Sequence, residues 1–155
     1  MNTSIRGFYL LTDTIKDTLL DDVNVNTVTT GDLTEVDLSK QTIFPLSHMI
    51  VNSVTSSENT LTFNISILSM DIVDQSKEIE TDIFVGNDNE QDVLNTQLGV
   101  LDRLMALLQR GDLYTEKYQV DADVTCEPFV DRFENKLAGW VATFDVQIQN
   151  DMTIC

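Results

Sequence analysis

Few residues in this chain have side chains that commonly carry out chemistry, and they lie far apart in the sequence. There is one histidine, His48, and there are two cysteines, Cys126 and Cys155, which form no CxxC pair. These residues do not have the close spacing of a zinc site. A catalytic Cys126 would need a nearby base, and His48 is the sole histidine available. We therefore expect a hydrogen-bonded, partly buried His48 and a small buried Cys126, in a protein from a reducing compartment.

Carboxylates are the remaining candidates, and they concentrate between Asp71 and Asp92. Their oxygens could bind Ca²⁺ or Mg²⁺, but the segment does not match the EF-hand loop, with its fixed glycine and its terminal glutamate. The sequence has no glycine-rich phosphate-binding loop either. A solvated acidic loop is therefore favoured, and we expect no cofactor, no metal and no enzymatic activity. A cation-binding domain that uses the Asp71–Asp92 carboxylates stays open as an alternative.

The periodicity of apolar residues predicts the elements that would position these side chains. Apolar residues at three- and four-residue spacing predict an amphipathic helix over residues 5–20. β-Branched residues then predict a strand over residues 23–29, which Gly31 ends. Residues 32–43 read as an acidic loop, and the proline at position 45 favours extended backbone in the residue before it.

Residues 46–72 alternate in a way that is typical of a long β-hairpin. The first strand is expected to place five residues on one face: Leu46, His48, Ile50, Asn52 and Val54. Turn-forming residues occupy positions 56–59. The second strand is expected to gather its large apolar side chains on one face: Leu61, Phe63, Ile65 and Ile67.

A second helix is predicted over residues 87–111, where Asn87 and Glu90 match a capping box and Gly111 ends the pattern. Its apolar face is expected to contain Leu94, Leu98, Leu101, Met105 and Leu108. Two further strands are predicted over residues 118–126 and 138–148, with a connection that begins at Pro128. The order of these elements predicts one α+β domain over residues 1–155, an antiparallel or mixed sheet with a long β-hairpin and two helices packed on one face.

The charge of the chain excludes several classes of function. Its 155 residues include 26 Asp and Glu but 9 Lys and Arg, for a formal net charge of −17. Such a surface repels polyanions, so high-affinity wrapping of DNA or RNA and binding to anionic membranes are not expected. No apolar run approaches the roughly 20 residues that span a bilayer, and the N-terminal segment lacks the apolar core of a secretory signal.

Three stretches of the sequence carry a resemblance to a known family. The first is IFPLSHMIVN at residues 43–52, which heads a hairpin ending in LSMDI at 68–72. The second is the helix from NTQL at residue 95 to Leu108, which follows an acidic loop. The third is FENKLAGW at 133–140, which opens a strand closing on QIQ at 147–149. In element order, nearly the whole chain resembles the tail-terminator-like family, the small neck and tail-completion proteins of tailed bacteriophages.

The resemblance implies a structural role in the virion neck, without covalent chemistry. Proteins of this family assemble as rings, typically of six or twelve subunits, in the host cytoplasm. The ring joins portal-side proteins, including portal adaptors, to the tail or tail tube, and genomic DNA passes through it without specific binding. A negatively charged channel would let DNA slide, because like charges repel. A close variant of this role is an adaptor ring nearer the portal.

The strong negative charge also means that identical subunits repel one another, so we expect less charged faces to form the contacts. The residues expected at the oligomer or partner interface are Leu46, His48, Ile50, Leu61, Phe63, Ile65 and Trp140. The residues expected on the acidic channel surface are Asp71, Asp74, Glu78, Glu80 and Asp82. A tryptophan in an alternating strand such as Trp140 is most often a core residue, and an interface anchor is the alternative for it. A second alternative function is an acidic protein that mimics DNA and inhibits a nucleic-acid enzyme.

Overall fold

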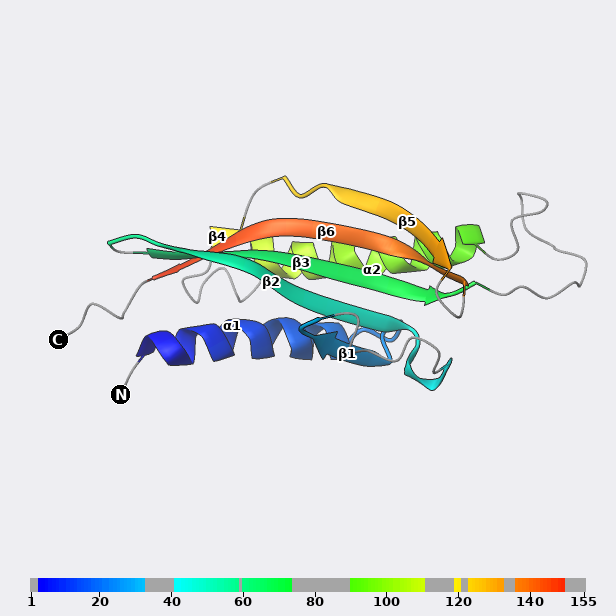
Figure 1. The fold of residues 1–155 in the computed structure, drawn as a ribbon, viewed down its shortest axis with the longest axis horizontal. Coiled ribbons are helices and arrows are strands. Elements are labelled where there is room, and N and C mark those ends of the chain that lie inside the picture. The colour runs from blue at the N-terminus through cyan, green and yellow to red at the C-terminus, as the bar shows by residue number, and fades with distance from the viewer. Residues whose placement is uncertain are drawn as a thin grey trace, which may run out of the picture.

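A twisted six-stranded sheet carries two long helices along one of its faces (Figure 1). This computed structural model describes residues 3–32, 41–58, 60–73, 90–110, 119–120, 123–132 and 136–149. The helices are α1 (Thr3–Leu20) and α2 (Glu90–Arg110). The strands are β1 (Thr27–Thr30), β2 (Leu46–Ser56), β3 (Thr60–Ile72), β4 (Gln119–Val120), β5 (Cys126–Arg132) and β6 (Lys136–Gln149). A short 3₁₀ turn, η2 (Gln41–Ile43), precedes β2.

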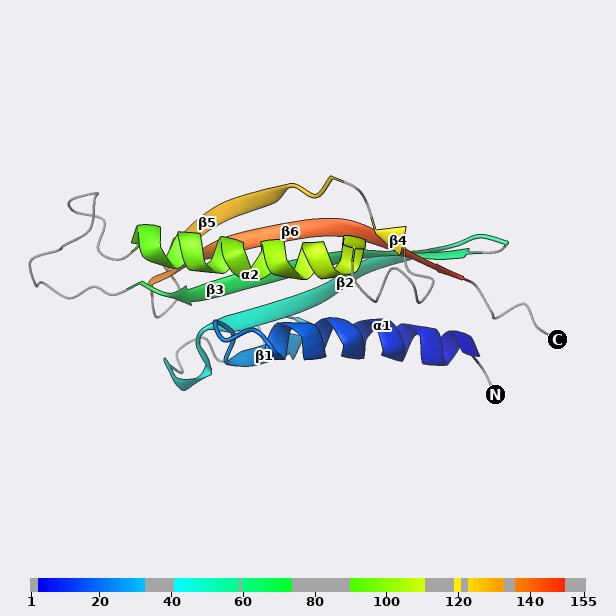
Figure 2. The same cartoon turned by 180° about the vertical axis from the view of Figure 1, so that it is seen from behind.

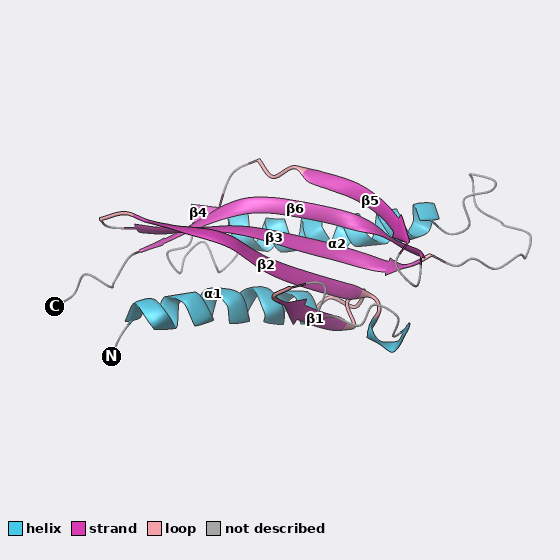
Figure 3. Ribbon diagram, viewed as in Figure 1, coloured by secondary structure: helices cyan, strands magenta, loops and turns pink. Residues whose placement is uncertain are grey.

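The sheet is mixed, because β1 runs parallel to β2 while the other pairs are antiparallel. The order across the sheet is β1-β2-β3-β6-β4, and β5 pairs with β6 beside β4. The predicted hairpin is confirmed as β2 and β3, and β3 pairs along its whole length with β6. These three long strands form the centre of the sheet, as the secondary-structure colouring makes clear (Figure 3).

Both helices pack on the same face of the sheet, which confirms the predicted arrangement (Figure 2). We call this the helix-covered face and the opposite one the open face. The buried stripe of α1 joins α2 and the odd-numbered residues of β3 in one core. Its largest fully buried members include Leu11, Ile15, Leu19, Ile65, Ile67, Leu101, Leu104, Leu108 and Phe144. The aromatic ring of Phe8 lies 5.7 Å from that of Phe63, which joins α1 to β3 directly.

The open face has a smaller apolar cluster at the end of the sheet where β2 begins. Phe44, Leu46, Met70 and Leu137 are buried there, with Phe129 of β5 packed against them. The register explains this grouping. Leu46 pairs with Met70, and Met70 pairs with Gly139. Leu137 lies two residues before Gly139 and therefore on the same face of β6. Farther along the open face the strands carry polar side chains joined across the ladder. Asn52 donates to Asn64 at 2.9 Å, and Asn64 donates to Asp145 at 2.8 Å.

Three features of the strands differ from the prediction. The first strand begins at Thr27 and not at residue 23, because the Asp22 carboxylate accepts the Asn24 N–H and holds the preceding residues in a turn. Residues 123–125 interrupt the strand predicted over 118–126. Pro128 lies inside β5 and starts no connection, since an edge strand tolerates a residue without an N–H.

The faces of β2 and α2 also need correction. A bulge between Val51 and Ser53 shifts the register of β2, so Val54 pairs with Phe63 and lies on the helix-covered face. In α2 the buried face includes Gln97 and Leu104, whereas Leu98 is 37% exposed. The helix itself is confirmed from Glu90 onward, and the capping residue Asn87 and the terminating Gly111 lie outside the described residues.

Candidate functional site

The residues expected at an interface fall on opposite faces of the sheet. Leu46, His48 and Ile50 lie on the open face. Leu61, Phe63 and Ile65 lie on the helix-covered face, where they are 6% exposed or less within the main core. The alternation was correctly predicted for β3 and for β2 as far as its bulge at Val51–Ser53, but the sequence did not show which face the helices cover. The structure therefore brings these residues together as two groups, and their role in an interface stays a prediction.

Trp140 connects the sheet to α2. It pairs with Ser69 on the helix-covered face, and its indole Nε1–H donates to the backbone oxygen of Leu94 at 2.7 Å. A partly buried tryptophan usually satisfies its single donor in this way. The side chain therefore packs within the subunit, in agreement with the core alternative.

His48 is fully buried, and both of its ring nitrogens have hydrogen-bond partners. Nδ1 lies 2.7 Å from the Thr29 hydroxyl, and Nε2 lies 2.8 Å from the backbone oxygen of Gly31. A carbonyl oxygen can only accept, so Nε2–H donates to Gly31, and in the neutral imidazole Nδ1 then accepts from the Thr29 hydroxyl. The expected hydrogen-bonded histidine is confirmed, and its bonds fasten β1 and the left-handed Gly31 (φ 94°) to β2.

Cys126 is poorly suited to nucleophilic chemistry. Its side chain is half-buried in β5, and burial together with the charge of Asp102 raises the pKa of the thiol. The thiol therefore stays protonated at neutral pH, whereas the thiolate is the reactive form. His48 lies in β2, and β3 and β6 separate that strand from β5 in the sheet.

Of the predicted acidic residues, Asp71 is described, while Asp74, Glu78, Glu80 and Asp82 lie outside the described residues. Asp71 is partly buried near the end of β3, and its carboxylate accepts the Ile72 N–H at 2.8 Å. Burial raises the pKa of this carboxyl group despite that hydrogen bond. Within the described ranges, no group of three or more His, Cys, Asp or Glu side chains could hold a metal ion.

Replacing Asp71 by asparagine is expected to stabilise the fold at neutral pH. Because the pKa of Asp71 is raised in the folded state, ionisation of the carboxyl group disfavours folding at pH values above that pKa. The midpoint of urea unfolding should therefore rise for Asp71→Asn at pH 7. The difference from wild type should shrink as the pH falls and Asp71 becomes protonated. A lower midpoint at pH 7 would contradict this account of Asp71.

The outer edge of β2 is open along the tip of the hairpin. The parallel strand β1 pairs with residues 46–49, and none of the described strands pairs with β2 on this side beyond Met49. The segment Asn52–Ser56 is exposed throughout and carries no charged side chain. Open edges of this kind are usually protected by lysine, proline or a covering element, because they pair readily with other chains. This segment is the clearest candidate for an interface in the described chain.

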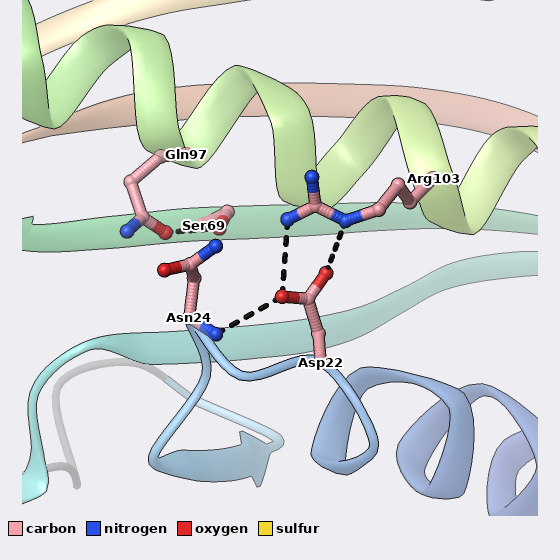
Figure 4. A network of polar contacts seen from close by, with 5 residues as sticks. All are labelled: Asp22, Asn24, Ser69, Gln97 and Arg103. Atoms are coloured by element: carbon pink, nitrogen blue, oxygen red, sulfur yellow. Dashed lines mark hydrogen bonds and ion pairs between the residues drawn. The ribbon is translucent and has the colours of Figure 1, made fainter.

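The helix-covered side has a second candidate, built around an ion pair that joins the turn after α1 to α2 (Figure 4). Arg103 of α2 donates twice to the Asp22 carboxylate, through Nε at 2.7 Å and Nη2 at 3.0 Å. The Asp22 side chain is 9% exposed, and that of Arg103 is 53% exposed. Burial alone would raise the pKa of Asp22, but the bonds from Arg103 and the Asn24 amide, with the guanidinium charge, hold this pKa below its ordinary value.

Gly99 makes room for this ion pair. A Cβ atom at position 99 would lie 3.1 Å from Nη1 of Arg103, which folds back along α2 to reach Asp22. Glycine inside a helix costs about 1 kcal/mol relative to alanine, so its presence in α2 has a structural reason. This relation was not evident in the sequence, because Asp22 and Arg103 are 81 residues apart.

Asp22→Asn is expected to lower the free energy of unfolding by about 1 kcal/mol at pH 7, the usual scale for a bidentate pair near the surface. Because the folded-state pKa of Asp22 is depressed, its contribution is present above the unfolded pKa and is lost as the pH falls through the folded pKa. Urea titrations of both proteins from pH 7 down to pH 3 should show the difference decreasing in the acid range. A difference that stays constant over this range would show that the ion pair is not its source.

Beside this ion pair, a small polar cluster is buried between α2 and the sheet. The Ser69 hydroxyl donates to Oε1 of Gln97 (Figure 4). Ser47, Ser69 and Gln97 are each 1% exposed or less. Nε2 of Gln97 and Oγ of Ser47 have no hydrogen-bond partner among the described residues. Such a cluster reduces the apolar area between helix and sheet, and the sequence pattern of α2 gave no sign of it.

A groove opens next to the Asp22–Arg103 pair, between the C-terminal end of α1, the turn that follows it and α2. Its volume is about 450 Å³. Buried side chains of Leu19, Val100 and Leu104 line it, and Leu107 and Val23 lie partly or fully exposed beside them. We call this the helix groove. Pockets of 300–1,000 Å³ are of the size that accepts a ligand or a partner side chain.

Comparison with known proteins adds no relative to this description. No protein-family model matches the chain, and no curated protein matches it. Neither of the helices in the described part of the chain is long and apolar enough to cross a membrane.

Proposed function

We propose that this chain is a structural subunit of a bacteriophage neck, either a tail terminator or an adjacent connector ring. Its copies assemble into a closed ring that joins portal-side proteins to the tail in the virion. The resemblance of the element order to the tail-terminator-like family suggests this role. The observation that carries the assembly step is the open, uncharged edge of β2 at Asn52–Ser56.

The two borders of the sheet differ, and this difference favours a ring. One border is formed by β1 and the free part of β2, and the other by β4 and β5. Pairing one border with the opposite border of the next copy is a head-to-tail contact, which closes into a ring when the rotation between subunits allows it. A contact made through backbone groups also suits a chain with a net charge of −17. Because Asn52–Ser56 has no charged side chain, this segment adds no charge repulsion to the contact between two subunits.

The open face of the sheet, and not the helix-covered face on which Asp71 lies, has a composition that suits a channel for DNA. Among the strand residues whose side chains are described, the charges on this face belong to Glu127 and Asp145, and both are negative. The neighbouring positions are polar and uncharged, including Asn64, Ser66 and Thr143. A surface of this composition offers phosphate groups no cationic partner, so DNA would not be held.

The proposal is tested by measuring assembly. Size-exclusion chromatography with light scattering should show a ring-sized oligomer, either of the chain alone or after addition of a portal-side or tail-tube protein. Negative-stain images of the same mixtures should show closed rings. A protein that stays monomeric and binds none of these neighbours would overturn the proposal. The proposal would also fail if the chain bound a DNA-binding enzyme tightly and DNA competed with the chain for that enzyme.

A further inference from the structure

We propose that the helix groove docks an apolar side chain from a basic segment of a partner protein. The proposal concerns the helix-covered side of the subunit and does not depend on strand-edge assembly at β2. It rests on three observations: the shape of the groove, the exposure of aliphatic side chains at it, and the charge of the α1 surface beside it.

The first two observations define an apolar seat. Leu19, Val100 and Leu104 are 1% exposed and line the groove from within. Val23 is 95% exposed and Leu107 is 47% exposed, although both line the same groove. Two large aliphatic side chains left in water next to a cavity would lose that exposure if an apolar side chain entered. Burial of this kind is the main source of affinity at the centres of protein interfaces.

The third observation selects the charge of the partner. Asp21 lines the groove, and Asp17 lies one turn earlier on the same side of α1; both are exposed. Lys16, three residues before the groove-lining Leu19, contributes one positive charge to this part of α1, against the two negative charges of Asp17 and Asp21. The charge of Arg103 is compensated by Asp22 at 2.7 Å. The groove side of α1 thus has a net negative charge that lysine or arginine of a partner would complement.

A second copy of this chain is a poor occupant for the same reason. The chain has 26 acidic and 9 basic residues, so any surface of a second copy would on average add repulsion to Asp17 and Asp21. A basic segment with an exposed leucine, isoleucine or phenylalanine satisfies both the apolar seat and the acidic rim. The same pair of requirements describes an amphipathic helix laid into a groove, which anchors through side chains on one face.

A labelled helical peptide of leucine and lysine, amphipathic and net positive, provides a direct probe. Its binding to the full chain is measured by fluorescence anisotropy and is expected to saturate. A peptide of equal length and charge with alanine in place of leucine should bind at least about tenfold more weakly, a loss equal to 1.4 kcal/mol. Equal binding of both peptides would overturn the proposal, because charge alone would then account for it.

Variants of exposed residues locate the site without risk to the core. Leu107→Gln is expected to weaken binding of the leucine–lysine peptide by about tenfold, and Val23→Ser should act in the same direction. Leu98→Gln is the matched control, because Leu98 is also an exposed leucine of α2 but does not line the groove. Its affinity should equal that of wild type. Equal losses in the two leucine variants would refute docking at the groove.

The charge requirement is tested separately. The double variant Asp17→Asn, Asp21→Asn should weaken binding and reduce its dependence on salt, whereas Asp92→Asn should change neither. Asp92 is exposed in the first turn of α2 and does not line the groove. An unchanged salt dependence in the double variant would count against the acidic rim. Dimerisation of the chain alone that Leu107→Gln abolishes would assign the groove to a second copy and overturn the proposal.

Discussion

Val54→Pro is expected to abolish ring assembly while leaving the subunit folded. The reason lies in the direction of the Val54 backbone groups. The Ser57 N–H donates to the Thr60 oxygen, so Ser57 and Thr60 form a hydrogen-bonded pair. Such pairs alternate along an antiparallel ladder, and therefore the Val54–Phe63 pair is not hydrogen-bonded. The Val54 N–H and C=O point outward to the open edge. Proline at position 54 removes the N–H that would donate a hydrogen bond to a neighbouring strand.

The substitution should be tolerated within the hairpin itself. Proline is compatible with an edge strand when its nitrogen faces away from the ladder, and it favours extended backbone in the residue before it, which Ser53 already has. The ring should therefore disappear in light scattering at concentrations where wild type assembles, while the circular dichroism spectrum stays the same. A closed ring contains the same contact at every subunit. A modest loss of binding free energy at each contact therefore has a large effect on assembly.

Val54→Thr is the matched control for this variant. Threonine is β-branched like valine and keeps the backbone N–H, so rings should form as in wild type. Thr55→Pro provides the opposite comparison. Thr55 and Thr62 form a hydrogen-bonded pair, so proline at position 55 would remove a hydrogen bond between β2 and β3 and damage the hairpin. Rings formed by Val54→Pro at wild-type concentrations would show that the β2 edge is not the subunit contact.

The elements with strong periodicity were predictable from the sequence, and their three-dimensional partners were not. The stripe of α1 and the alternation of β2 and β3 each reflect burial on one side, so the type of element follows from the pattern. The bulge at Val51–Ser53 has no signature in that alternation, and it moved Val54 to the other face. A one-residue change in register exchanges the two faces of a strand, which limits any prediction of surface residues.

The candidate site was less accessible to sequence reasoning than the fold. The open β2 edge depends on where β1 stops, and a four-residue strand leaves a weak sequence signal. The ion pair of the helix groove joins Asp22 and Arg103, which only the packing of α1 against α2 brings together. Gly99 was the one local sign, since a glycine inside a predicted helix indicates a packing reason. Its partner could not be named without the structure.

Gly139→Ala is expected to have the largest effect on stability, a loss of about 3 kcal/mol or more, because overpacking between two backbones cannot be relieved by a change of rotamer. A Cβ atom at position 139 would overlap the backbone oxygen of Ser69 and lie 2.8 Å from Cα of Met70. To accept it, β3 and β6 would have to separate at the point where Trp140 and Leu137 anchor both apolar clusters.

The helical glycine supplies a control for this prediction. In Gly99→Ala the new Cβ would meet the terminal guanidinium of Arg103, which can move, and alanine favours the helix by up to about 1 kcal/mol. Urea unfolding at pH 7 should therefore show a small change for Gly99→Ala and a large loss for Gly139→Ala. Since β3 and β6 form the centre of the sheet, an intact Gly139→Ala protein of wild-type stability would mean that the two strands are farther apart than described.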